Sequence, residues 1–251
     1  MPTARLVQIS AWSYSRYGDY AQCPLKARCK IIDRLPEPES RAGENGTRVH
    51  ILAAAVTLGR MPALDRQTEK YRAEIERILK TRELPEELRT FTEEFQRMRR
   101  LKARAEEQWC FDRDWRPTDW FGRDAWLRIK VDCHWLDVTK KKNGLRDTVV
   151  HVRDHKTGKE NADHALQRSL YGLGALLQYP DAARVVVEHW YLDPGKIGGP
   201  DSWERADVPG LKEEWLKRTK AMLSDTTFAP RPGQYCAWCA FSKAKKGPCP
   251  F

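Results

Sequence analysis

Apolar residues recur along this chain with two different periods, and the period changes near residue 108. Before that point they fall at helical spacing in four segments, Tyr14–Ala21, Val49–Leu58, Gln67–Thr81 and Pro85–Glu107. A loop is expected to begin at Pro36 and to be prolonged by Gly43 and Gly46, since proline and glycine break regular structure. The charge-rich stretch 59–107 is predicted to form a helical insert with a solvated outer face.

From Gln108 onward the pattern is typical of strands, and it later alternates between strands and helices. The expected strands cover Trp109–Trp115, Trp126–Val138, Thr148–Asp154 and Ala183–Leu192. The expected helices cover Ala162–Leu177 and Leu211–Leu223. A turn at Lys140–Gly144 and a loop at Pro194–Pro200 separate elements, and a tail rich in proline, glycine and cysteine follows Phe228. This order predicts an α/β core with a helical addition.

Composition narrows the function without deciding it. With 251 residues, 41% of them hydrophobic, the chain can bury one sizeable core. An excess of 45 Lys and Arg over 35 Asp and Glu favours a polyanionic partner, nucleic acid first. The sequence shows no secretory signal and no membrane-spanning stretch, so a cytoplasmic protein with no membrane partner is expected.

Carboxylates and a lysine lie where two predicted strands end. Asp154 closes one strand and Asp132 lies in the preceding one. Two neighbouring strands can bring both carboxylates to one point, where they can bind Mg²⁺ or Mn²⁺ and, through it, a phosphate. Lys156 follows Asp154 by two residues and therefore projects from the same face of the strand. There it can orient an attacking water and offset charge on the phosphate.

The ordered set of motifs resembles the RecB-like PD-(D/E)XK nucleases. The residues that carry the resemblance are Gly46-x-x-x-His50, Asp132, Asp154-x-Lys156 and Gln167-x-x-x-Tyr171. The resemblance implies a restriction-endonuclease-like core, with a central mixed sheet flanked by helices, in a single nuclease domain over residues 1–251.

The resemblance also implies roles for these residues. His50, Asp132 and Asp154 would ligate Mg²⁺ or Mn²⁺, helped by the backbone carbonyl of His155. Lys156 would be the catalytic lysine. Gln167 and Tyr171 would shape the catalytic site and touch the DNA strand.

Seven cysteines need an explanation other than disulfides in a cytosolic protein. Cys110 and Cys133 lie in strand-like stretches and are expected to be buried apolar residues. Cys236-x-x-Cys239 and Cys249 form a group that could hold zinc or an iron–sulfur cluster. Cys23 can supply the fourth ligand, with Cys29 as a competitor, so the metal and the fourth ligand both stay open at this point.

The stretch 13–26 is similar to the opening of the iron–sulfur subgroup of RecB-like nucleases, which includes the Cas-four proteins and the AddB nuclease domain. This similarity implies that Cys23, Cys236, Cys239 and Cys249 hold a 4Fe–4S cluster, in a region made of residues 13–29 and 228–251. Zinc remains the alternative. Arg16, Trp238 and Lys243 are further candidates for DNA contact.

The function expected from these motifs is exonucleolytic hydrolysis of DNA from its ends, as single-stranded or frayed DNA. It would serve recombination and repair, phage DNA processing or CRISPR adaptation, with the proteins of those processes as partners. Two alternatives stay open. One is a catalytically silent DNA-binding or adaptor subunit, and the other is a zinc-stabilised RNA-binding protein.

Overall fold

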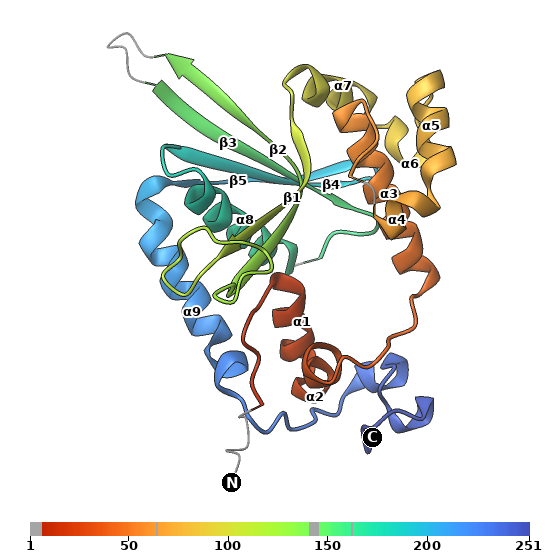
Figure 1. Ribbon diagram of the computed structural model, residues 1–251, viewed down its shortest axis with the longest axis vertical. Coiled ribbons are helices and arrows are strands. Elements are labelled where there is room, and N and C mark those ends of the chain that lie inside the picture. The colour runs from red at the N-terminus through yellow and green to blue at the C-terminus, as the bar shows by residue number, and fades with distance from the viewer. Residues whose placement is uncertain (1–6, 64, 141–145, 162) are drawn as a thin grey trace. The chain divides into compact units, whose positions relative to one another are not determined.

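A computed structural model describes residues 7–251 except 64, 141–145 and 162. Its centre is one five-stranded sheet with the spatial order β1-β2-β3-β4-β5 (Figure 1). The strands are β1 (Arg104–Phe111), β2 (Leu127–Lys140), β3 (Arg146–Lys156), β4 (Arg184–Tyr191) and β5 (Lys196–Glu204).

Pairing within the sheet is mixed. β2 and β3 are antiparallel, with Cys133 opposite Arg153, and β4 and β5 are also antiparallel. β3 and β4 are parallel, with Val152 opposite Val187. A parallel pair needs a crossover connection, and helix α8 (Asp163–Gln178) provides it. The expected α/β fold with a mixed sheet and flanking helices is confirmed.

The remaining helices lie before the sheet and after it. None of the described helices combines the length and the hydropathy needed to cross a bilayer. The α-helices are α1 (Tyr14–Gln22), α2 (Pro24–Ala27), α3 (Arg41–Leu58), α4 (Arg66–Lys70), α5 (Arg72–Thr81), α6 (Glu86–Arg89), α7 (Thr92–Arg100) and α9 (Val208–Ser224). The shorter helical segments are η1 (Arg28–Ile32), η2 (Arg205–Asp207), η3 (Gln234–Trp238) and η4 (Lys243–Lys245).

The start of α3 differs from the sequence prediction. Ser40 caps the helix by accepting a hydrogen bond from Gly43 N at 3.0 Å. Gly43 and Gly46 therefore lie inside a helix rather than in a loop. A serine cap and the buried face further along the helix outweigh the cost of two interior glycines. The helix ends at Gly59, whose φ of 63° is the left-handed conformation that glycine adopts readily.

The predicted insert 59–107 is helical only as far as Arg100. Its first helix is broken at Tyr71, and its second is divided into α6 and α7. Residues from Arg104 onward form β1 instead of the end of a helix, because they pair with the sheet. The prediction of a loop at 194–200 is also wrong from Lys196 onward, because β5 begins there. β5 is an edge strand, and edge strands tolerate glycine and proline.

The strand predicted at 109–115 ends at Phe111, and a turn follows it. Most of the other predicted elements are confirmed to within a few residues. These are the helices at 14–21, 162–177 and 211–223 and the strands at 126–138, 148–154 and 183–192. The turn predicted at 140–144 lies almost wholly outside the described residues.

The described chain divides into two compact units, and whether 1–251 behaves as one domain stays a prediction. Unit 2 comprises residues 40–109 and 129–211. In its core, α3, α5 and α7 cover the sheet face that carries Cys133, Trp135 and Trp190. Helix α8 packs on β3, β4 and β5, and Gly172 lets it approach Trp203 closely. The sheet of unit 2 is thus covered on both faces.

Unit 1 comprises residues 1–39, 110–128 and 212–251. Its core is built around Trp12, which is fully buried, stacks on Trp215 at 5.6 Å and meets Trp126 edge-on at 5.6 Å. Tyr20 donates a hydrogen bond to Asp225 Oδ2 at 2.9 Å, which joins α1 to the end of α9. Both ends of the chain therefore belong to this one unit.

Candidate metal centre

Three side chains of unit 2 place ligand atoms within 4.8 Å of one another: His50, Glu106 and Asp132. His50 comes from the middle of α3, Glu106 from β1 and Asp132 from β2. Asp132 is 7% exposed, whereas His50 and Glu106 are half-buried. One imidazole and two carboxylates form a donor set that suits Mn²⁺ or Mg²⁺.

Asp132 is held as a carboxylate. Its Oδ2 lies 3.2 Å from His50 Nδ1 and accepts a hydrogen bond from His155 N at 2.8 Å. Burial would raise the pKa of Asp132, but His50 and the His155 N–H outweigh it and bring that pKa far below its usual range. Burial lowers the pKa of His50, while the Asp132 carboxylate more than compensates and brings it to about 9.

Asp154 sits at the centre of a second network next to the first. Its Oδ1 accepts a hydrogen bond from Tyr171 OH at 2.6 Å, and Tyr171 OH in turn accepts one from Gln167 Nε2 at 3.2 Å. Lys156 Nζ lies 2.6 Å from Asp154 Oδ2. Because Cys133 pairs with Arg153, Asp132 and Asp154 occupy neighbouring positions on adjacent strands. The structure therefore brings together His50, Asp132, Asp154, His155, Lys156, Gln167 and Tyr171.

Two buried oxygens leave acceptor capacity for a cation. Glu106 Oε1 accepts no hydrogen bond from any described residue. Asp154 Oδ2 accepts none of good geometry within the described chain, although Lys156 Nζ lies close to it. A buried carboxylate oxygen without a donor is costly, and a divalent ion would satisfy it. The residues present thus fit a divalent metal.

Histidines border the centre without being charged. Burial lowers the pKa of His155 to about 4 and that of His189 to about 4. His189 Nε2 lies 3.4 Å from Asp154 Oδ2. The His155 ring packs against Phe95 with centroids 5.6 Å apart. The backbone N–H of His155 donates to Asp132. Ligation of the metal by the His155 backbone carbonyl stays a prediction.

Glu106 is the member of this group that sequence reasoning missed. It lay within a segment predicted to be helical, and nothing in the sequence separates it from Glu107. The backbone at Glu106 adopts a φ of 57°, a strand irregularity that turns its side chain toward His50 and Asp132. Burial and the Asp132 carboxylate raise the pKa of Glu106, opposed by Lys130, with which it forms an ion pair.

Unit 1 contains a cavity of about 320 Å³ that Cys23, Cys236, Cys239 and Cys249 all line. Cys23 Sγ accepts a hydrogen bond from Arg231 N at 3.3 Å, and Cys236 Sγ accepts one from Gly233 N at 3.4 Å. No three cysteine sulfurs in the described chain lie within 4.8 Å of one another. The cavity gathers the four predicted ligands, but it does not show a cluster.

The other cysteines are buried. Cys110 and Cys133 are 3% and 0% exposed, which confirms them as core residues. Cys29 is 1% exposed and does not line the cavity. Burial raises the pKa of its thiol, and Asp33, Cys239 and Cys249 contribute to the same shift. Cys29 thus lies near the cavity without lining it.

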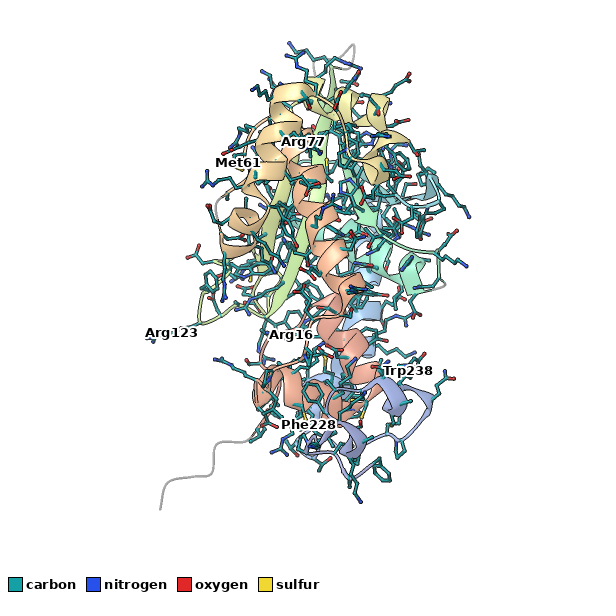
Figure 2. All side chains as sticks on the ribbon, turned by 90° about the vertical axis from the view of Figure 1, so that its right-hand side faces the viewer. Arg16, Met61, Arg77, Arg123, Phe228 and Trp238 are labelled. Carbon is teal, nitrogen blue, oxygen red and sulfur yellow. The ribbon has the colours of Figure 1, made fainter. Side chains whose placement is uncertain are left out.

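The further candidates for DNA contact differ in exposure. Trp238, labelled in Figure 2, is 77% exposed on the C-terminal segment. Lys243 is exposed as well. Arg16 is half-buried, and its Nη1 donates a hydrogen bond to Ala11 O at 2.7 Å. Its guanidinium is therefore partly committed to the fold of unit 1.

Comparison with known proteins gives one family. The model of the PD-(D/E)XK nuclease superfamily matches residues 11–244. Among solved structures, the chain is similar to the crystal structure of SSO0001, with 14% sequence identity and a TM-score of 0.36, over 99% of this chain and 89% of that chain. No curated protein matches the chain significantly. The family match spans His50, Glu106 and Asp132, and it ends before Cys249.

Proposed function

On the premise that the chain belongs to the PD-(D/E)XK nuclease superfamily, we propose that it is a Mg²⁺- or Mn²⁺-dependent deoxyribonuclease that hydrolyses DNA from its ends. The family implies a nucleic-acid substrate. The observation that carries the proposal is the convergence of His50, Glu106 and Asp132 beside the network of Asp154, Lys156 and Tyr171.

His50, Asp132, Asp154 and Glu106 are the residues that would hold the metal. When bound, a divalent ion polarises a phosphate and lowers the pKa of a coordinated water. The donor set is already oriented: the His155 N–H fixes Asp132, and Tyr171 OH fixes Asp154. Such supporting hydrogen bonds hold ligand carboxylates in place.

Lys156 is the residue best placed to act on the substrate. Its side chain is 21% exposed, whereas that of its partner Asp154 is 3% exposed. Lys156 therefore pairs with a buried carboxylate while remaining accessible to solvent. It can hold the attacking water and stabilise negative charge on the phosphate. Tyr171 and Gln167 keep Asp154 aligned and form the wall that a strand would touch.

Action on ends is supported by the Gln167–Tyr171 pair. This pair resembles the Gln-x-x-x-Tyr motif of family members that degrade DNA from its ends. The same resemblance supports a place in DNA recombination and repair, phage DNA processing or CRISPR adaptation, with the proteins of those processes as partners.

The test is Mn²⁺-dependent digestion of labelled linear DNA beside closed circular DNA. Wild-type protein should degrade linear DNA, and Lys156→Ala should lower the rate by at least about 100-fold. Lys159→Ala is the matched control, because Lys159 is an exposed lysine three residues away. Nicking of circles with linear DNA left intact would contradict action on ends. Absence of any cleavage would contradict the nuclease proposal and favour the alternative of a catalytically silent DNA-binding or adaptor subunit.

We also propose that the four-cysteine cavity of unit 1 holds a 4Fe–4S cluster, which would place the chain in the iron–sulfur subgroup. The support for this proposal is that all four predicted cysteines line one cavity of about 320 Å³. The N–H groups that point at Cys23 and Cys236 suit thiolate ligands.

Anaerobic purification decides between the metals. A broad absorbance band near about 400 nm together with bound iron would support the cluster. A colourless protein that contains zinc would refute it and leave the nuclease proposal intact.

A further inference from the structure

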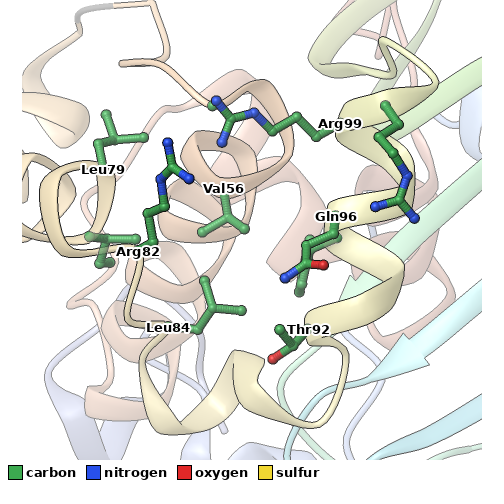
Figure 3. Close-up of a pocket in the computed structure, with 11 residues that line it drawn as sticks. Val56, Leu79, Arg82, Leu84, Thr92, Gln96 and Arg99 are labelled. Carbon is green, nitrogen blue, oxygen red and sulfur yellow. The ribbon is translucent and has the colours of Figure 1, made fainter.

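The helices of unit 2 enclose a pocket away from the metal centre. It has a volume of about 620 Å³ and lies between the ends of α3, α5 and α7. Val56, Leu79 and Leu84 line it with apolar surface, and Thr92 and Gln96 add polar groups. Arg82 lies on one side of the pocket and the α7 residues lie on the other (Figure 3).

A second pocket of about 540 Å³ adjoins the first and shares Arg99 with it. The guanidinium of Arg99 rests against Gly59, because a Cβ built there would lie 2.4 Å from Arg99 Cζ. This places a cation at the C-terminal end of α3, where the helix dipole stabilises it. Arg99 is thus held between the two pockets, which we call together the lobe groove.

The charge in the lobe groove is one-sided. Among the described residues that line it, Glu107 is the only carboxylate, and it pairs with Arg104 at 3.2 Å. The other cations form no ion pair with a described residue. These are Arg60, Arg82, Arg99, Arg100 and Lys102.

Both pockets of the lobe groove are lined by residues that neighbour the metal centre. In the first, Phe95 lines the wall and packs its ring against His155. In the second, Ala105 and Glu107 line the wall on either side of Glu106 along β1. The lobe groove is therefore lined by residues that neighbour the candidate ligands, although His50, Glu106 and Asp132 themselves do not line it.

We propose that the lobe groove binds single-stranded nucleic acid, with the arginines on its phosphates and one base in the apolar pocket, and guides the strand to the metal centre. The inference rests on the proposed nuclease function and names how its substrate is held.

Each part of the groove matches one part of a nucleotide. Guanidinium groups form paired hydrogen bonds with phosphate oxygens. The apolar walls offer contact area to the face of a base, and Thr92 and Gln96 can bond its edge. An acidic protein would satisfy the arginines but would leave the apolar side chains Val56, Leu79 and Leu84 of the pocket without a partner. A strand satisfies both features.

The experiment measures binding of a fluorescent thymidine oligonucleotide to the full chain in EDTA, so that no metal-dependent cleavage interferes. The double variant Arg82→Gln, Arg100→Gln should bind about tenfold more weakly than wild type. The slope of log affinity against log salt should fall by about 1.4, since each of the two lost phosphate contacts releases roughly 0.7 counterions in single strands.

Arg77→Gln is the matched control, because Arg77 is an exposed arginine of α5 that lines neither pocket. It should bind as wild type does. Thermal midpoints check that all three proteins are folded, as expected for exposed positions.

Equal affinity of the double variant and Arg77→Gln would overturn the inference. So would arginine-dependent binding of polyglutamate without binding of the oligonucleotide, which would indicate an acidic protein partner. The binding assay contains no metal, so it is independent of cleavage. A protein that fails to cleave DNA would refute the proposed function, and the binding assay would still test the role of the lobe groove.

Discussion

Glu106 and Glu107 are adjacent carboxylates on β1 that the fold uses differently. Glu106 turns toward His50 and Asp132 and leaves one oxygen without a donor in the described chain. Glu107 lies one position further along β1, where it pairs with Arg104 and lies 3.5 Å from His134. Only the local backbone of β1 separates the two roles, so the pair offers a matched test of metal ligation.

Glu106→Gln should weaken Mn²⁺ binding by about tenfold or more, because it removes a charged ligand oxygen and keeps the side-chain volume. Glu107→Gln should leave Mn²⁺ affinity unchanged. Titration of Mn²⁺ followed by electron paramagnetic resonance measures this without requiring activity. Equal affinities of the two variants would show that Glu106 is not a ligand.

His151 predicts a pH dependence of stability. It stacks on Trp135 with ring centroids 4.8 Å apart, and burial followed by Arg153 lowers its pKa to about 4. An unfolded histidine takes up its proton near pH 6.5. Between about pH 6.5 and 4 the unfolded state therefore binds more protons, and stability is lost as the pH falls through this window.

His151→Gln removes that contribution. The free energy of unfolding of the variant should fall less steeply than that of wild type between about pH 6.5 and 4. Urea denaturation at several pH values measures the two slopes. Parallel slopes would mean that His151 is as easily protonated in the fold as in the unfolded chain.

At the scale of elements, the C-terminal segment depends on a close turn at Gly247. Gly247 N donates to Ser242 O at 2.9 Å, and Cys249 N donates to Phe241 O at 3.0 Å. A Cβ on Gly247 would meet the Phe241 carbonyl carbon and oxygen at 2.3 Å, and backbone cannot move aside as a flexible side chain can. The turn that presents Cys249 to the cavity thus requires glycine.

Gly247→Ala should reduce the metal bound by the cysteine cavity by at least about half, because Cys249 is displaced from it. Gly233→Ala is the control from the same segment, since a Cβ there meets nothing within 4 Å. Iron and zinc analysis of both proteins measures the effect. Full metal content in Gly247→Ala would show that Cys249 is dispensable.

Elements whose apolar residues recur with a clear period could be predicted from the sequence. Elements that form only because strands distant in sequence pair with them could not. The strands that carry Asp132 and Asp154 place buried apolar residues at every second position, as with Ile129 and Val131 or Val150 and Val152, so their period is clear. β5 contains two glycines and a proline and forms because β4 supplies its hydrogen bonds. Arg104–Glu107 has a polar pattern that suits a helix surface, and only the sheet makes it a strand. Glu106 was missed for this reason, whereas the motif residues around it were found.

At the scale of the whole molecule, unit 1 joins the two ends of the chain around one cavity. Cys23 and Cys236 are far apart in sequence, so a cluster on both closes a loop of most of the chain. Closing such a loop restricts the unfolded state and stabilises the folded one. This predicts that the cavity ligands matter for stability as well as for metal content.

Cys236→Ala should lose the absorbance near about 400 nm and lower the thermal midpoint by at least about 5 °C. Cys110→Ala, which removes a buried thiol of unit 1 that does not line the cavity, should retain the absorbance. Calorimetry and absorbance on anaerobic protein measure both effects. An unchanged midpoint in Cys236→Ala would refute the stabilising role of the cavity.

The two units are completed at different times during translation. Unit 2 ends at Leu211, whereas the last stretch of unit 1 begins at Lys212 and carries Cys236, Cys239 and Cys249. A ribosome therefore delivers every residue of the metal centre before it delivers three of the four cavity cysteines. Since compact units fold as they emerge, the nascent chain can form the centre first. Metal loading of the cysteine cavity, as proposed above, would then follow formation of the metal centre.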